Sequence, residues 1–86
     1  MQKKFDPAVA EKLGVTLLNT AEIMEVETEN IQKSFKVLGE TFRDQAYNEF
    51  QGELNAADKT MASIIEDMKS LSKAVLRYRA QMIDLL

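Results

Sequence analysis

The residues in this chain that are best suited to chemistry are carboxylates, and four of them lie close together in the first half. They are Glu22, Glu25, Glu27 and Glu29. Carboxylate oxygens are the ligands that hard divalent cations prefer. On a helix, however, these positions point in several directions, and their spacing is not that of an EF-hand loop. We therefore expect a solvated acidic surface with no metal site and no cofactor.

Other catalytic residue types are missing or wrongly placed. The chain contains no cysteine and no histidine, so redox pairs, the usual zinc ligands and Ser/His pairs are absent. It also has no glycine-rich phosphate loop. Small all-α chorismate mutases resemble this chain in length and helicity, but they clamp the substrate carboxylates with arginines, including one on the first helix. The first arginine here is Arg43, so we predict that the chain is not an enzyme.

Size and charge exclude further classes of protein. The 86 residues suffice for one small domain, which without disulfides needs an idealised helix interface or a partner for stability. The net charge of −3 gives no basic surplus for nucleic acid. No segment approaches the roughly 18 consecutive apolar residues of a membrane span. Because no apolar core follows the charged start at Met1 to Lys4, we expect no use of the general secretory route.

The chain is expected to be all-α. Its only proline, Pro7, follows the good capping residue Asp6 at a place where a helix can begin. No alternating β-branched run and no Asn-Gly or Asp-Gly hairpin turn is present. Two glycines, Gly39 and Gly52, are candidates for a turn between two helices, and each is followed by a capping-box pattern.

Hydrophobic periodicity selects Gly39 as the turn. Two sets of residues at seven-residue spacing are apolar or aromatic without exception, and they run straight through Gly52. The first set is Tyr47, Leu54, Met61, Met68, Val75 and Met82, and the second is Phe50, Ala57, Ile64, Leu71, Tyr78 and Leu85. Together they are expected to form one uninterrupted apolar seam inside the hairpin. Gly52 is then an outward-facing position of the second helix, where it costs about 1 kcal/mol relative to alanine.

The first half has a register of its own, which ends at Leu38. It consists of Ala10, Leu17, Met24, Ile31 and Leu38. The next member would be the polar Gln45, and the nine-residue step from Leu38 to Tyr47 fits no heptad. The phase therefore breaks at a turn built on Leu38, Gly39 and Thr41, with Gly39 as a left-handed stop.

These observations predict one domain, an antiparallel two-helix hairpin. The expected bounds are about 7–38 for the first helix, 38–41 for the turn and about 42–85 for the second helix. The longer second helix is expected to outreach the first, leaving residues 75–86 unsupported. Helices with a wide apolar face belong in bundles, so we expect packing against a partner or a second copy. The expected partner surface comprises Leu18, Val26, Ile65, Val75, Tyr78, Met82 and Leu85.

Two short motifs lie at the predicted turn: Val37-Leu38-Gly39 leads into it, and Ala46-Tyr47 follows it. They resemble the Trp-x-Gly turn motif, with valine in place of tryptophan, and the alanine–aromatic pair of the ESAT-6-like (WXG) family of type VII secretion. The resemblance extends to the short length and the two long helices. The chain is most similar to the small helical partner proteins of LXG toxins, which bind the toxin's helical N-terminal domain and help deliver it to the secretion machine.

The resemblance implies a protein that is cytoplasmic before export and is secreted without a cleavable signal peptide, together with an LXG toxin or a related hairpin. The family's export signal is Tyr-x-x-x-Asp or Tyr-x-x-x-Glu. Here Tyr78 is followed four residues later by Met82, with Asp84 nearby, which implies a composite signal shared with the partner's helix. The residues leave open an adaptor or secretion chaperone that is never exported, and a homodimeric four-helix bundle.

Overall fold

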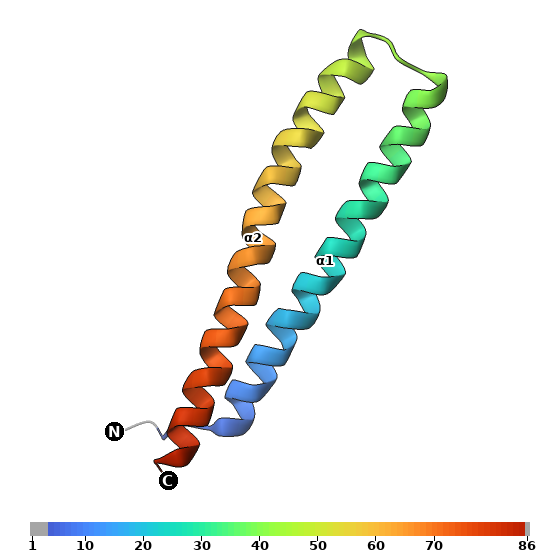
Figure 1. The fold of residues 1–86 in the computed structure, drawn as a ribbon. Helices are drawn as coiled ribbons and strands as arrows, with labels where there is room; N and C mark the ends of the chain where they lie inside the picture. Colours follow the sequence, from blue (N-terminus) through green and yellow to red (C-terminus); the bar gives the residue numbers. More distant parts are fainter. Residues whose placement is uncertain (1–3, 86) are drawn as a thin grey trace.

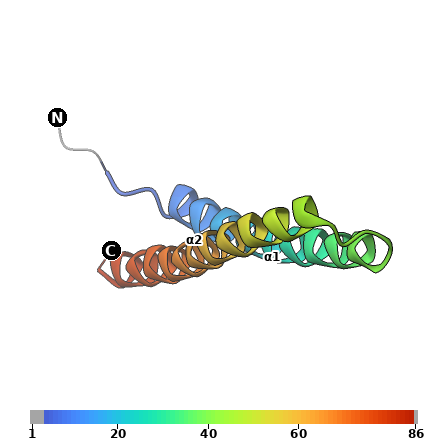
Figure 2. The ribbon, with the colours of Figure 1, turned by 90° about the horizontal axis from the view of Figure 1, so that it is seen from above.

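The computed structural model describes residues 4–85, which form two α-helices, α1 (Pro7–Thr41) and α2 (Gln45–Asp84). The helices run side by side in opposite directions, so the start of α1 lies beside the end of α2 (Figure 1). We term this the open end of the hairpin. The rod measures 62 × 19 × 18 Å, and its two helices cross when seen from above (Figure 2). The predicted all-α hairpin is confirmed.

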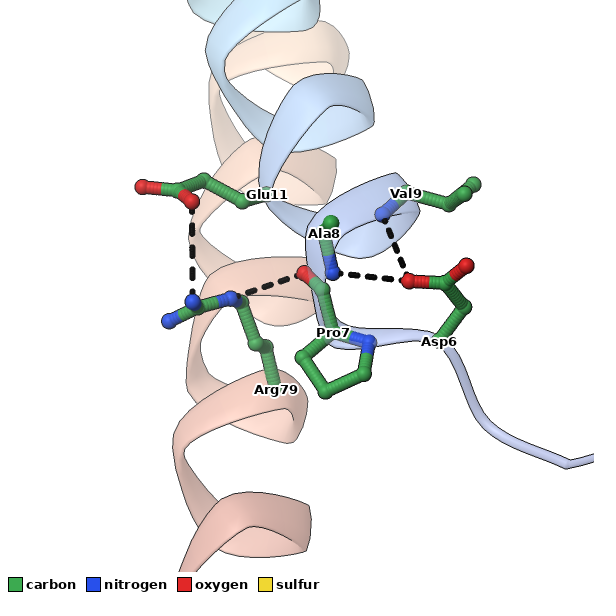
Figure 3. Close-up of polar contacts among 6 residues, drawn as sticks. All are labelled: Asp6, Pro7, Ala8, Val9, Glu11 and Arg79. Atoms are coloured by element: carbon green, nitrogen blue, oxygen red, sulfur yellow. Dashed lines mark hydrogen bonds and ion pairs between the residues drawn. The ribbon is translucent and has the colours of Figure 1, made fainter.

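Helix α1 begins where the sequence predicts. The Asp6 side chain accepts hydrogen bonds from the main-chain N–H groups of Ala8 at 3.0 Å and Val9 at 3.3 Å (Figure 3). Pro7 occupies the first helical position, where its missing N–H leaves no intrahelical hydrogen bond unmade. Within the described residues, neither α1 nor α2 carries a stretch apolar enough to cross a lipid bilayer.

The turn lies later in the chain than predicted. Helix α1 continues through Gly39 to Thr41, and no described residue has a positive φ, so the expected left-handed stop is wrong. The Leu38 carbonyl accepts hydrogen bonds from the Phe42 main-chain N–H at 3.0 Å and from the Thr41 hydroxyl at 3.3 Å. The Gly39 carbonyl accepts a further hydrogen bond from Arg43 Nε at 2.9 Å, so two carbonyls of the last turn have partners without a left-handed residue. The turn is therefore 42–44, in place of 38–41.

Gly39 is a packing residue. A β-carbon at Gly39 would lie 2.5 Å from the Cζ atom of Tyr47, so only glycine leaves room for this ring. The ring stacks on Phe35 with centroids 4.5 Å apart. Asp44 caps α2 by accepting a hydrogen bond from the Tyr47 main-chain N–H at 2.9 Å, which fixes the start of the helix at Gln45. Gly39 thus allows α1 and α2 to meet beside the turn.

Gly52 behaves as predicted. It lies inside α2, is exposed, and no atom comes within 4 Å of the place where its β-carbon would be. It is therefore a surface glycine in a continuous helix.

Small residues bring the helices together near the open end. Ala10, Gly14 and Ala21 of α1 are buried. The Ser72 hydroxyl of α2, in a residue only 2% exposed, donates a hydrogen bond to the Gly14 carbonyl at 2.6 Å. A β-carbon at Gly14 would lie 2.6 Å from Cγ of Leu76. The interface between the helices, termed the seam, is therefore close-packed through small side chains.

Only one of the two apolar sets of α2 lies in the seam. The set that starts at Tyr47 is buried or half-buried, whereas the set that starts at Phe50 is exposed throughout. Beside the Tyr47 set, on the side away from the Phe50 set, the seam is completed by Asp58, Ile65, Ser72 and Arg79 of α2. The prediction of one seam containing both sets is therefore half wrong. Hydrophobicity alone misassigns the seam, because small and polar residues permit a closer approach of the helices than the bulky set does.

Candidate interaction surface

The exposed set of α2 and four residues of α1 form one side of the hairpin, termed the apolar face. It comprises Phe50, Ala57, Ile64, Leu71 and Tyr78 of α2 with Val9, Leu13, Ile31 and Leu38 of α1. Residues seven apart share one side of a helix, and the α1 members line the same two grooves as members of the α2 set. Phe50 is 54% exposed and Leu71 is 52% exposed. Exposed apolar patches of this kind are typical of interaction surfaces, so the apolar face is the candidate surface of this chain.

The groove nearer the turn, termed the turn-end groove, has a volume of about 830 Å³. Its apolar lining is Ile31, Phe35, Leu38, Phe50, Leu54 and Ala57. Its polar lining is Glu27, Asn30, Ser34 and Glu53. Both helices contribute to it, so a side chain inserted there would contact α1 and α2 together.

A second groove of about 560 Å³ lies at the open end. Its apolar lining is Phe5, Val9, Ala10, Leu13, Ala74, Val75 and Tyr78, and Lys4 and Asp6 complete it. The Phe5 ring meets the Tyr78 ring edge-on, with centroids 5.4 Å apart. The segment before α1 therefore covers part of the apolar face at this end.

The opposite side of the hairpin is polar. Lys69 forms an ion pair with Glu25 across the two helices, and the hydrogen bond to this carboxylate raises the pKa of Lys69. Nearer the turn, a shallow groove on this side is lined by three basic residues, Lys33, Lys36 and Arg43. Positive charge near the turn thus gathers on the side away from the apolar face.

An arginine ties the two helices together at the open end. The Arg79 guanidinium donates from Nε to the Pro7 carbonyl at 2.9 Å and pairs with Glu11 at 3.5 Å (Figure 3). Val75, one turn earlier, is half-buried. The expected overhang of α2 from residue 75 is therefore wrong, because the start of α1 supports α2 at least as far as Arg79.

The three predicted turn residues lie in or beside the last turn of α1. Leu38 is 48% exposed on the apolar face, Gly39 is buried against Tyr47, and Thr41 is the last residue of the helix. Val37, which stands in the tryptophan position of the family motif, is 61% exposed. Leu38 therefore belongs to the apolar face as well as to the end of the helix.

The predicted partner residues fall into three groups, which are exposed, half-buried and buried. Leu18, Val26, Tyr78 and Leu85 are exposed, whereas Val75 and Met82 are half-buried. Ile65 is only 7% exposed, so its assignment to a partner surface is wrong. It is part of the seam because it stands four residues after Met61, on the flank that faces α1. Within the export-signal candidate, Tyr78 and Asp84 are exposed and Met82 is half-buried.

The assignment of partner residues from the sequence missed the centre of the apolar face. Phe50, Ile64 and Leu71 belong to the second heptad set, and the sequence pattern had placed that set inside the hairpin. The flank of α2 that lies in the seam contains Asp58 and Ser72, which are small or polar and therefore give no hydrophobic signal. Among residues 4–85, no group of three or more acidic side chains is placed to hold a metal ion.

Comparison of the chain with family models, with curated proteins and with solved structures found no match.

Proposed function

We propose that this chain is a non-enzymatic helical hairpin of type VII secretion that acts as an exported adaptor: it binds the helices of a partner such as an LXG-type toxin, contributes to the partner's delivery and is exported with it. The observation that carries the proposal is the apolar face, where large side chains such as Phe50, Leu71 and Tyr78 are about half exposed. Packing this face against further helices produces a helical bundle, the arrangement that such wide apolar surfaces require.

The placement of the charged and polar groups supports a packing role in preference to a chemical one. The two grooves are shallow and mainly apolar; Asp6 of the open-end groove caps α1, and the acidic members of the turn-end groove are exposed. Catalysis needs titratable groups that converge on a reacting atom in a pocket. The grooves offer apolar contact area along the rod instead, which suits a partner helix.

The type VII assignment rests on the family resemblance around the turn and at the carboxyl end. Tyr78 and Asp84 are exposed on the last turns of α2, where a receptor could contact both. In this proposal the secretion machine recognises Tyr78, Met82 and Asp84 together with the adjoining helix of the partner. Because Tyr78 also belongs to the apolar face, partner binding and machine recognition meet at the open end.

Export from the native host tests the proposal. Deleting the last dozen residues would also remove Val75 and Arg79, which support the hairpin. Point variants therefore separate loss of the export signal from loss of the fold. We expect the double variant Tyr78→Ala/Asp84→Ala to retain its helical circular dichroism and to disappear from the culture supernatant. Val15→Glu, an exposed aliphatic position outside the apolar face, serves as control and should leave export unchanged.

Each alternative gives a different result. An adaptor or chaperone that is never exported would stay with the cells even as the unaltered chain. A homodimeric four-helix bundle would show twice the 9.8 kDa mass of one chain in solution without a partner. Unchanged export of the double variant would contradict the assigned signal.

A further inference from the structure

The charged residues that line the turn-end groove are both acidic. Glu27 and Glu53 line the groove on opposite helices, and none of the groove-lining residues is lysine or arginine. Asp67 continues the acidic edge along α2, three residues after Ile64 of the apolar face. The apolar floor of the turn-end groove is thus bordered by carboxylates on both helices.

The distribution of charge at the turn end is polarised across the hairpin. The basic groove of Lys33, Lys36 and Arg43 lies on the other side of Phe35, whose side chain lines both grooves. Glu27 and Glu53 are exposed and have no ion pair of 4.0 Å or less among the described residues. Their charge is therefore available to a partner that covers the apolar floor.

A second copy of the chain is a poor occupant of this surface. In a parallel arrangement the turn-end grooves would meet each other, and carboxylates would be buried against carboxylates without a cation. In an antiparallel arrangement the turn-end groove would meet the open-end groove, whose charged lining residues, Lys4 and Asp6, offset each other. Neither arrangement supplies a surplus of positive charge.

We propose that the turn-end groove takes an amphipathic helix of another protein, whose apolar stripe is flanked by lysine or arginine. Apolar anchors at i, i+3 or i+4, and i+7 would lie on the floor between Ile31, Leu38 and Phe50. Basic residues on either side of that stripe would face Glu27 and Glu53. The charges steer the encounter and select the partner, while the apolar floor supplies the contact area.

This inference rests on the proposed adaptor function and names the chemistry of its partner. Two labelled synthetic helical peptides serve as probes, with the same heptad stripe of leucines and with either lysine or glutamate at the flanking positions. Binding to the full chain is measured by fluorescence anisotropy. We expect the lysine peptide to bind about tenfold or more tightly than the glutamate peptide, with a preference that shrinks between about 50 mM and about 300 mM salt.

Replacing the two glutamates that line the turn-end groove by lysine should invert the preference between the two peptides. In Glu27→Lys/Glu53→Lys both substituted positions are exposed, so the fold is retained and the glutamate peptide becomes the tighter ligand. The matched control is Glu29→Lys/Glu66→Lys, which changes the net charge equally on the opposite, polar side. This control should keep the original preference for the lysine peptide.

The outcomes separate the two proposals. Equal binding of both peptides would overturn the basic-helix inference and leave the adaptor function standing. Equal effects of the Glu27/Glu53 and Glu29/Glu66 double variants would do the same. A chain that is dimeric in solution and excludes both peptides has a second copy on this face, which also overturns the inference. A monomeric chain that binds neither peptide counts against the helix-packing function itself.

Discussion

Ile64 and Ile65 are adjacent residues of the same type, yet they belong to different surfaces of α2. Ile65 is 7% exposed in the seam, whereas Ile64 is 41% exposed on the apolar face. The seam combines the buried or half-buried Tyr47 set with small residues such as Ser72 and Gly14, while the Phe50 set stands exposed on the apolar face. The hairpin therefore closes through close approach of its helices at small residues and leaves a second set of large hydrophobic side chains exposed.

The largest expected effect is the difference in the free energy of unfolding between the variants Ile65→Ala, in the seam, and Ile64→Ala, on the apolar face. Truncation of the buried isoleucine should lower the free energy of unfolding by about 2–4 kcal/mol, because it removes packed methyl groups and leaves a cavity. Truncation of Ile64 should cost less than about 1 kcal/mol, because much of its side chain is already in water. Urea unfolding followed by circular dichroism measures both. Equal losses would indicate that the apolar face is covered in solution.

Gly39 and Gly52 allow the same comparison between a buried and an exposed position. Gly39→Ala should destabilise the hairpin by about 1–3 kcal/mol, because the new methyl group meets the Tyr47 ring, which is held against Phe35. Gly52→Ala should stabilise it by about 0.5–1 kcal/mol, since the position is open and alanine is the better helix former. Thermal unfolding of the pair is the measurement. A stabilising Gly39→Ala would mean that Tyr47 does not pack there.

The smallest effect is expected on the polar side, at the Lys69–Glu25 pair. The hydrogen bond to Glu25 raises the pKa of Lys69 above its ordinary value of 10.5. The stabilisation is therefore complete below that value and is lost as the pH rises through the higher pKa of the folded state. Between about pH 9 and about pH 12 the melting temperature should fall slightly more for the unaltered chain than for Glu25→Gln. Identical pH profiles would show that the pair contributes nothing to stability.

The fold class, the start of α1 and the surface position of Gly52 follow from the sequence, because capping residues and unbroken heptads act locally. The position of the turn does not. From its residue type alone, Gly39 is expected to end the helix. Only the position of Tyr47 across the hairpin shows that the glycine is needed to make room for the Tyr47 ring.

The orientation of α2 was also beyond the sequence pattern. On α2 the Tyr47 set has one set of residues on each side, and either could complete the contact with α1. Hydrophobicity favours the set that contains Leu71. The helices approach on the other flank, where Ser72 meets Gly14, and a small polar residue gives no hydrophobic signal. The export-signal assignment of Tyr78, Met82 and Asp84 stays a prediction.

Three hydrogen bonds from side chains of α2 to main-chain carbonyls of α1 fix how far one helix can slide along the other. Arg79 donates to Pro7, Ser72 to Gly14, and the Tyr47 hydroxyl to Phe35 at 3.5 Å. The first two are spaced by seven residues on both helices, as antiparallel chains require. A shift of one helical turn, about 5.4 Å, would break all three at once. The rod therefore resists axial shear, and a pull on the last turn of α2 loads both helices together.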